Sequence, residues 1–316
     1  MIEITNANQD TPESQPAKPV RTLEALLELY EQGYRNFSGS DLRGVTIDIL
    51  DKEITQIDLS RIILKDSNLT CAIFYRTNIT LKVDLFEADF SNCNLQGASL
   101  FRSKLTGANF SNSNLQGVNL SQSKIDQCNF NNSCLSGANL TYSSCRGSDF
   151  IKAILQNVRF DSSDFTASDF TETNFSRSTL PLSGTFTAAN FTRANLRSTS
   201  LSGQFTQTNF SEANLQSAKI GSTFIASNLS GANLRSASLS GDFSQANFSK
   251  SNLSKSILKS FTAQGIDFSD ADLQVSEVSN VTLKYCYYNS KTKFSECIDP
   301  VASGMELIED EIESED

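Results

Sequence analysis

The sequence predicts an all-β fold, a quadrilateral parallel β-helix (solenoid), and three repeating patterns carry this prediction. From Phe90 to Leu180, every fifth residue is Leu, Ile or Phe, with Cys145 as the one exception. A helix needs apolar residues about every 3.6 positions and a flat strand about every second position, so a period of five fits neither. Phenylalanine also recurs every 20 residues from Phe90 to Phe170, which groups four units into one coil. After residue 201 a shortened unit returns every 19 residues, so the same side of each coil is contracted.

Two residues of each five-residue unit are expected to face the interior. The central Leu or Phe fills a narrow space, so the residue two places before it must be small, as Ala138 is before Leu140. The coils should stack about 4.8 Å apart through backbone hydrogen bonds. Each large buried side chain then contributes roughly 1.5–3 kcal/mol before the entropy of ordering is subtracted. The predicted ladder of core residues is Phe90, Phe110, Phe130, Phe150, Phe170, Phe191, Phe210 and Phe248.

The units follow the motif A-(D/N)-L-x-x, for example at residues 108–110, 138–140, 194–196 and 232–234. On these residues the chain resembles the pentapeptide-repeat proteins over about residues 37–283. The resemblance implies that the β-helix is right-handed. The two ends of the chain also look like those of such proteins in cyanobacteria, some of which act in the regulation of cell differentiation.

Five segments are expected along the chain. They are a disordered N-terminal segment (1–21), a capping helix (22–35), the repeat region (36–283), a C-terminal cap (284–305) and a disordered acidic tail (306–316). The first segment is polar and rich in proline, and the last holds seven acidic residues and no basic one.

The capping helix is predicted by the pattern between Thr22 and Gly33. Thr22 is a candidate N-cap, and Gly33 is expected to end the helix. The residues between them place one apolar stripe on the helix, made of Leu23, Leu26, Leu27 and Tyr30. We expect this stripe to cover the open edge of the first coil.

The repeat region departs from its strict period at several places. The units are irregular before residue 59, and single residues are inserted near 80–84 and near 181–185. Pro181, the only proline of the repeat region, lies in the second insertion. The shortened sides follow from residue 201 onward. We expect the axis of the rod to bend near Pro181.

The net charge of −10 arises at the two ends of the chain. Thirteen of the 36 acidic residues, but only three of the 26 basic ones, lie in residues 1–35 and 306–316. The repeat region between them is neutral, and we interpret the acidic tail as a solubilising segment. Because the basic residues are scattered along the sequence, no nucleic-acid-binding groove is predicted.

The cellular context is inferred from the cysteines and from the hydropathy. Seven cysteines, an odd number without metal-like spacing, are typical of a reducing compartment. No apolar run is long enough to span a membrane, so we expect a cytoplasmic protein without membrane association. A monomer is the favoured oligomeric state.

The chain offers little for catalysis. It contains no histidine, and no phosphate-binding loop, metal-ligand spacing or nucleophile elbow is present. We therefore expect no enzyme, no cofactor and no metal. Asp149 and Asp169 should stack in one outward column with Asp164 one side away, but Asn109 and Asn129 occupy the same column. These carboxylates are accordingly interpreted as part of the repeat.

The predicted function is that of a non-catalytic protein–protein interaction rod, regulatory or scaffolding, with an unidentified protein partner. A candidate partner patch combines outward apolar and basic residues, namely Tyr142, Arg146, Ile151, Lys152, Ile154 and Arg159. The alternative is a DNA-mimic inhibitor or protector of DNA gyrase, as some relatives are. This alternative implies a continuous acidic face and a C-terminal dimerisation helix, which the neutral repeat region and the segment around Pro300 do not suggest.

Overall fold

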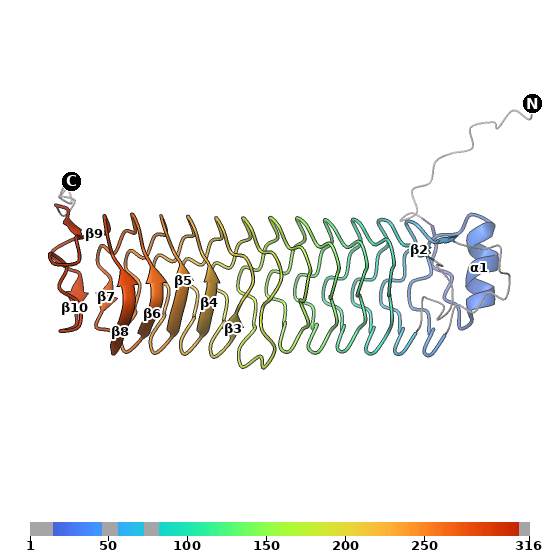
Figure 1. Cartoon of the computed structure of the whole chain (residues 1–316). Helices are drawn as coiled ribbons and strands as arrows, with labels where there is room; N and C mark the ends of the chain where they lie inside the picture. Colours follow the sequence, from blue (N-terminus) through green and yellow to red (C-terminus); the bar gives the residue numbers. More distant parts are fainter. Residues whose placement is uncertain (1–14, 46–55, 73–81, 310–316) are drawn as a thin grey trace, which may run out of the picture.

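Stacked coils of nearly constant shape form a long rod in the computed structural model, which describes residues 15–45, 56–72 and 82–309 (Figure 1). One helix, α1 (Leu23–Glu31), lies at the N-terminal end. The described strands are short: β1 (Gln56–Asp58), β2 (Lys82–Asp84), β3 (Ser200–Leu201), β4 (Lys219–Thr223), β5 (Ser238–Asp242), β6 (Ile257–Thr262), β7 (Asp272–Leu273), β8 (Glu277–Thr282), β9 (Tyr287–Tyr288), β10 (Lys293–Phe294) and β11 (Glu306–Leu307).

Parallel backbone bridges between coils confirm four units per coil. Asp89 pairs with Asn109, and Asn109 pairs with Asn129, so the register is 20 residues in the first regular part of the rod. The register becomes 21 where Asp169 pairs with Asn190, because one residue is inserted there, and falls to 19 between Asn190 and Asn209. The shortened sides predicted from the sequence are therefore confirmed.

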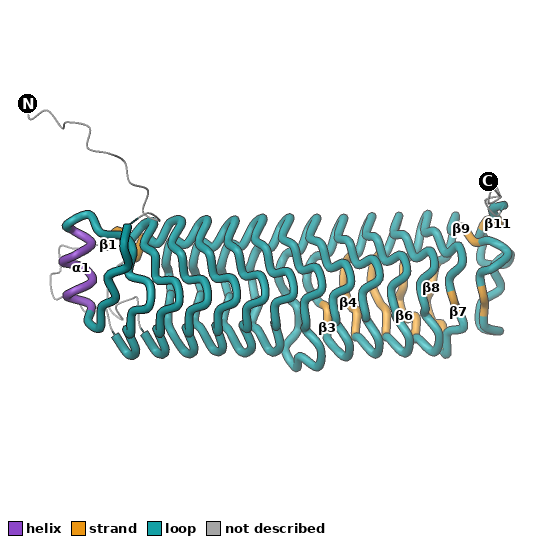
Figure 2. The backbone as a smooth tube through the Cα atoms, turned by 180° about the vertical axis from the view of Figure 1, so that it is seen from behind, coloured by secondary structure: helices purple, strands orange, loops and turns teal. Residues whose placement is uncertain are grey.

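Each coil has four sides, numbered here in chain order by the central residue of one coil. Side 1 carries Leu105, side 2 carries Phe110, side 3 carries Leu115 and side 4 carries Leu120. Most of the chain forms single bridges rather than extended strands, as Figure 2 shows. The main exception is side 4 in the C-terminal half, where the parallel strands β3, β4, β5, β6 and β8 form one sheet in that order (Figure 2).

Glycine relieves crowding at the shortened junction after side 4 in two of the coils. A Cβ at Gly203 would collide with the carbonyl oxygen of Gly184. Gly241 has a φ of +114°, and a Cβ there would collide with the carbonyl oxygen of Ser222. At these two positions the backbone of one coil contacts that of the preceding coil directly, and only glycine leaves the room. Ser222 takes the equivalent position in the coil between them and pairs with Gly241.

The corner geometry explains the repeat motif. In a representative corner, the amide of Ala108 donates to the carbonyl of Leu105 at 2.8 Å, which closes a turn. The side chain of Asn109 then accepts from the amide of Ser111 at 3.1 Å and donates to Asp89 of the preceding coil at 3.2 Å. An Asn or Asp before the central residue thus fixes the next corner and links two coils.

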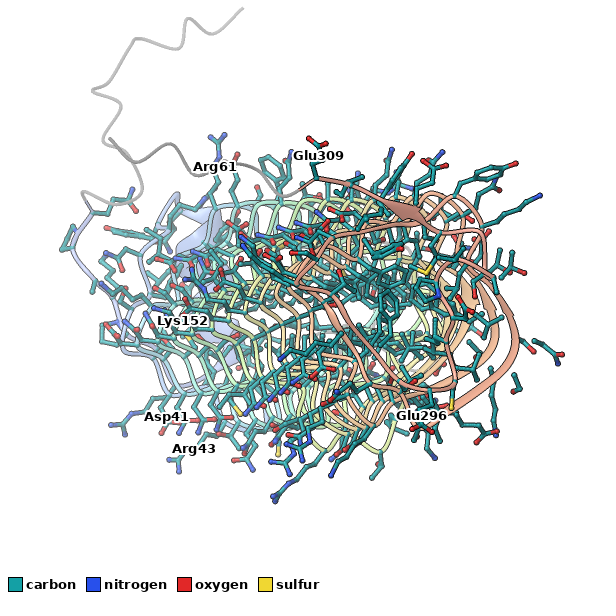
Figure 3. The ribbon with its side chains drawn as sticks, turned by 90° about the vertical axis from the view of Figure 1, so that its left-hand side faces the viewer. Asp41, Arg43, Arg61, Lys152, Glu296 and Glu309 are labelled. Atoms are coloured by element: carbon teal, nitrogen blue, oxygen red, sulfur yellow. The ribbon has the colours of Figure 1, made fainter. Side chains whose placement is uncertain are left out.

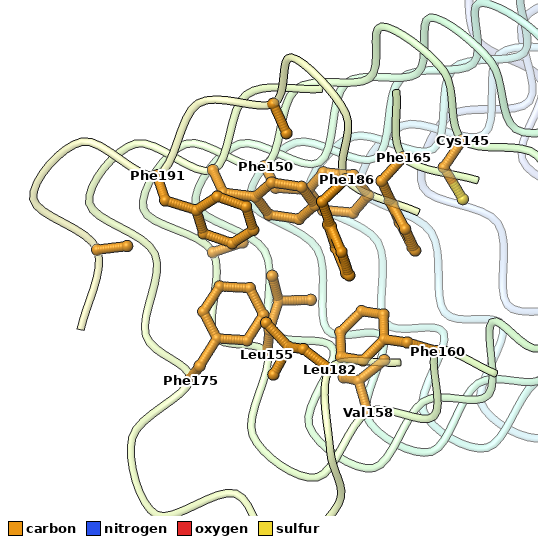
Figure 4. Packing of buried hydrophobic residues seen from close by; sticks show 14 of the residues in the cluster. Cys145, Phe150, Leu155, Val158, Phe160, Phe165, Phe175, Leu182, Phe186 and Phe191 are labelled. Atoms are coloured by element: carbon orange, nitrogen blue, oxygen red, sulfur yellow. The ribbon is translucent and has the colours of Figure 1, made fainter. Parts of the chain in front are cut away.

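The predicted aromatic ladder is confirmed, with one interruption. All eight of its phenylalanines are fully buried. From Phe90 to Phe210 the ring centroids of successive coils are 4.7–5.0 Å apart, and the rings are stacked. Leu229 takes the next position, so Phe248 packs instead near Phe268, at 5.5 Å. Figure 4 shows how Phe150 and its neighbours fill the interior.

The N-terminal end is closed by α1, as predicted. The Thr22 hydroxyl accepts from the amide of Ala25 at 3.2 Å, and Leu26 and Tyr30 are buried. The prediction of disorder up to residue 21 is wrong for residues 15–21. The amide of Lys18 donates to the carbonyl of Asn36 at 2.9 Å, and Val20 is buried. This segment is ordered because it provides hydrogen bonds to the open edge of the first coil.

At the C-terminal end, parallel stacking continues beyond the predicted boundary at residue 283. Strand β10 pairs with β7, and β11 pairs with β9. Glu306 and Leu307 therefore belong to the last stacked segment and not to a disordered tail. The physical reason is that backbone pairing needs an extended chain in register but not the A-(D/N)-L-x-x side chains.

The predicted bend near Pro181 is wrong, because the rod runs straight through this region in the view of Figure 1. The extra residue is accommodated in a loop that bulges from one side, while Phe165 and Phe186 remain stacked at 5.2 Å. The insertion near 80–84 is larger than predicted, since Ile63 pairs with Asp89 in a register of 26 residues. Much of this insertion, and of the irregular part before residue 59, lies outside the described residues.

The core ladder yields a stability prediction. Phe130 stacks on Phe110 at 4.9 Å and on Phe150 at 4.8 Å, so Phe130→Ala should lower the free energy of unfolding by about 3–5 kcal/mol. Tyr142→Ala is the control, since Tyr142 is 65% exposed, and it should change stability by less than about 0.5 kcal/mol. Denaturant titration measures both variants, and equal effects would contradict this account of the core.

Candidate interaction surfaces

The buried thiols are unsuited to nucleophilic chemistry. Burial raises the pKa of the Cys93 thiol to about 12, and complete burial raises the pKa of Cys145 well above that of an ordinary thiol. Both residues lie in the packed interior as small hydrophobic side chains. Within the described ranges, no group of three His, Cys, Asp or Glu residues is placed to hold a metal ion, and no helix is long and apolar enough to cross a membrane.

The aspartates of sides 1 and 2 belong to the corners. Asp169 accepts hydrogen bonds from the amide and hydroxyl of Thr171 at 2.8 and 2.6 Å. Asp164 lies on side 1 and accepts from Arg146 Nε at 2.6 Å. Asp149 is the next residue of the Asp169 column, and partial burial together with the charge of Asp169 raises the pKa of Asp149. These carboxylates therefore take the structural place of the Asn or Asp in each repeat unit, which agrees with their interpretation from the sequence.

The six residues of the predicted partner patch do not form one surface. Their positions within the units place Tyr142 at the corner between sides 4 and 1, and Arg146 at the corner between sides 1 and 2. Ile151 and Lys152 lie at the corner between sides 2 and 3, Ile154 on side 3 and Arg159 on side 4. The prediction fails because 18 consecutive residues make almost a full circuit of a 20-residue coil. Figure 3 shows charged side chains, Lys152 and Arg61 among them, projecting at different points of the perimeter.

Basic residues on sides 1 and 2 are largely neutralised by acids of the same or a neighbouring coil. Lys152 lies 3.7 Å from Glu172, and Arg193 lies 3.6 Å from the same carboxylate. Further pairs at these sides are Arg61–Glu87, Lys104–Asp84, Lys124–Asp126 and Arg146–Asp164. Such exposed pairs contribute little stability, about 0–1 kcal/mol each, but they cancel the charge of the surface that they cover.

A different arrangement is found along the edge between sides 3 and 4. Residues 173–260 contain eight basic and only two acidic residues, and those acids, Glu212 and Asp242, lie on sides 2 and 1. Five of the basic residues are exposed along this edge and are called the basic ridge: Arg177, Arg197, Lys219, Arg235 and Lys255. None of these five has an ion-pair partner in the part of the chain that the structure describes, whereas Lys259, at the other end of side 4, pairs with Glu277 at 3.0 Å.

Shallow depressions follow the basic ridge. One of about 530 Å³ is lined by Arg177, Thr179, Ser198 and Lys219, together with other Ser and Thr residues. The next, of about 260 Å³, lies over β3, β4 and β5 and is lined largely by Ser residues and by Gly221. The sequence prediction missed this surface because its basic residues are separated by about one coil length in the sequence. Aligning the basic residues by their position within each coil would have shown that they share one edge.

A family model described as pentapeptide repeats matches residues 84–122, 103–141, 143–180, 186–221 and 220–274, which together span more than half of the chain. A search of curated proteins found no match.

Several solved structures are similar to the chain. HetL, a pentapeptide repeat protein involved in heterocyst differentiation regulation from the cyanobacterium Nostoc sp. strain PCC 7120, is 20% identical; the match covers 88% of this chain and 98% of HetL, with a TM-score of 0.28. QnrB1, a plasmid-mediated fluoroquinolone resistance protein, is 17% identical over 86% of this chain and 92% of its own, with a TM-score of 0.27. A pentapeptide repeat protein from the Arabidopsis thaliana thylakoid lumen is 30% identical over 31% of this chain and 68% of its own, with a TM-score of 0.25.

Thiol reactivity should divide the cysteines by position. Cys71 and Cys297 are exposed, so iodoacetamide should alkylate them in the folded protein at mildly alkaline pH. Cys93 and Cys145 should react only after unfolding, because burial both shields the sulfur and raises the thiol pKa. Mass spectrometry of native and denatured samples measures the alkylation of each cysteine. Rapid labelling of Cys145 in the native protein would contradict its burial in a packed interior.

The Asp149 carboxyl should make stability depend on pH. Because its pKa is raised in the folded protein, this residue favours folding below the pKa of an ordinary aspartate, and that contribution is lost as the pH rises through the raised value. Asp149→Asn should therefore raise the melting temperature near neutral pH but not in acid. A pH-independent effect of Asp149→Asn would contradict the assignment.

Proposed function

Because the chain belongs to the pentapeptide-repeat family, we propose that it is a non-catalytic protein-interaction rod with a regulatory or scaffolding role. The observation that carries this proposal is the filled interior: the central residues along the regular part of the rod are buried and packed on one another. A partner therefore meets only the outer sides, which repeat with every coil. Repeat solenoids commonly use such extended surfaces to bind proteins.

The side-chain chemistry of the described residues supports a non-catalytic role. The chain has no histidine, the interior thiols are protonated at neutral pH, and the aspartates of sides 1 and 2 are tied to corners and ion pairs. Hydrolysis or proton transfer would need such groups to converge in a cleft with a nucleophile or base. The depressions along the rod are instead lined by hydroxyl and basic side chains.

The gyrase-directed DNA mimic receives less support from the charge distribution. Such a mimic needs a continuous acidic face, whereas the outward column of side 2 mixes Asn and Asp. On sides 1 and 2 many acids are paired with bases, and the edge between sides 3 and 4 is basic. These observations favour an interaction rod over imitation of a nucleic acid.

Affinity purification from native cells tests this proposal. The full chain is immobilised as bait, and an excess of free chain is added as competitor in a parallel sample. We expect one or a few proteins to be retained in near-stoichiometric amounts and to be displaced by the free chain, as quantified by mass spectrometry. Recovery of gyrase subunits, with inhibition of supercoiling by the purified chain, would favour the DNA mimic. The absence of any displaceable protein would contradict the interaction function.

A further inference from the structure

We infer that the basic ridge is the docking surface for an extended acidic segment of a partner protein. This inference rests on the proposed function and adds the chemistry of the partner. The contrast between two kinds of surface on the same rod supports it. Most bases on sides 1 and 2 have carboxylates of this chain beside them, with Lys250 as an exception, whereas none of the five ridge residues has an ion-pair partner among the described residues.

The ridge residues are spaced as an array. Arg177 and Arg197 lie on neighbouring coils, since the amide of Arg177 donates to the carbonyl of Arg197 at 2.9 Å. The array continues over the next three coils, which carry Lys219, Arg235 and Lys255 in turn. With coils about 4.8 Å apart, five coils span roughly 20 Å, which is the length of about six residues of extended chain.

The ridge side chains suit carboxylates. The guanidinium groups of Arg177, Arg197 and Arg235 each present a planar fork of donors that matches a carboxylate in a bidentate arrangement. All three are exposed, so they are available to a partner without rearrangement of the rod. An uncompensated positive array also attracts an acidic partner over distance and accelerates its association.

Side 4 provides room for a peptide backbone beside the ridge. Strands β3, β4 and β5 present small residues there, including Ser200, Gly221 and Ser240, which line the depression of about 260 Å³. Small residues let an extended chain approach the sheet closely, and the hydroxyl groups offer hydrogen bonds. Lys219 lines both depressions and so joins the side 4 surface to the ridge.

Two observations favour an acidic protein over a nucleic acid. All seven phenylalanines between residues 177 and 259 are buried, so the ridge offers no aromatic platform on which bases would stack. The array is also short, roughly 20 Å over five coils, which suits a short acidic segment better than a long phosphate backbone. A short carboxylate-rich segment needs only the local positive array.

Charge reversal provides the test. The ridge variant carries Arg177→Glu, Arg197→Glu and Arg235→Glu. The matched control carries Lys152→Glu, Arg193→Glu and Lys250→Glu, three exposed bases at the corner between sides 2 and 3 that give the same change in net charge. Circular dichroism and melting temperature confirm that both variants fold. Fluorescence anisotropy then measures binding to labelled poly-L-glutamate and to a single-stranded poly-dT oligonucleotide.

We expect poly-L-glutamate to bind the wild-type chain, with an affinity reduced at least about tenfold in the ridge variant and less than about threefold in the control. Equal losses in the two variants, or tighter binding of poly-dT than of poly-L-glutamate, would overturn the inference. Affinity purification with both chains distinguishes failure of the ridge assignment from failure of the interaction function. If the wild-type chain and the ridge variant retain it equally, only the ridge assignment fails. If the wild-type chain retains no partner, the interaction function itself fails.

Discussion

The parallel hydrogen bonds between coils are the constraint on which the rest of this structure depends. They hold each coil about 4.8 Å from the next, so any residue in the repeat lies directly over its equivalent. This stacking places Phe110 on Phe130 in the interior and Asn114 beside Asn94 on the outside. A side chain that suits one coil therefore suits every coil, which is why the sequence repeats. Where the side chains depart from the motif, as at Tyr287, the backbone still pairs.

The same constraint moves function to the surface. In the described part of the rod, one large residue per side fills the narrow interior and leaves no space for a ligand, and the reactive groups there are buried thiols. Outward positions can vary, provided that the corner can form. Charge is distributed unevenly over these positions: among the described residues, the charges on sides 1 and 2 are largely neutralised within the chain and those between sides 3 and 4 are not. Unpaired charge in an ordered array is a property that a partner can recognise.

The sequence predictions were accurate where they depended on residues close together in the chain, and they failed where they depended on which residues the stacked coils bring together. Inward and outward positions, the corner residues and the Thr22 cap depend on neighbours a few residues away, and these predictions are confirmed. The partner patch failed because residues such as Arg146 and Ile154 are near in sequence but lie at different sides of the coil. The basic ridge was missed for the opposite reason, since Arg177 and Arg235 are far apart in sequence but share one edge. The bend at Pro181 failed because a corner loop absorbs an insertion without disturbing the core.

By itself, the sequence determined the period, the four-sided coil, the composition of the core and the presence of a capping helix, because these depend on local repetition and side-chain size. Only the tertiary structure decided which residues become neighbours around and along the rod. That outcome depends on the accumulated register, which changes from 27 and 26 to 20, 21 and 19 residues along the chain and returns to 20 between Asn247 and Asp267. One inserted residue shifts every later position relative to the earlier ones, so surfaces such as the basic ridge follow from the stacking of whole coils and not from any single repeat.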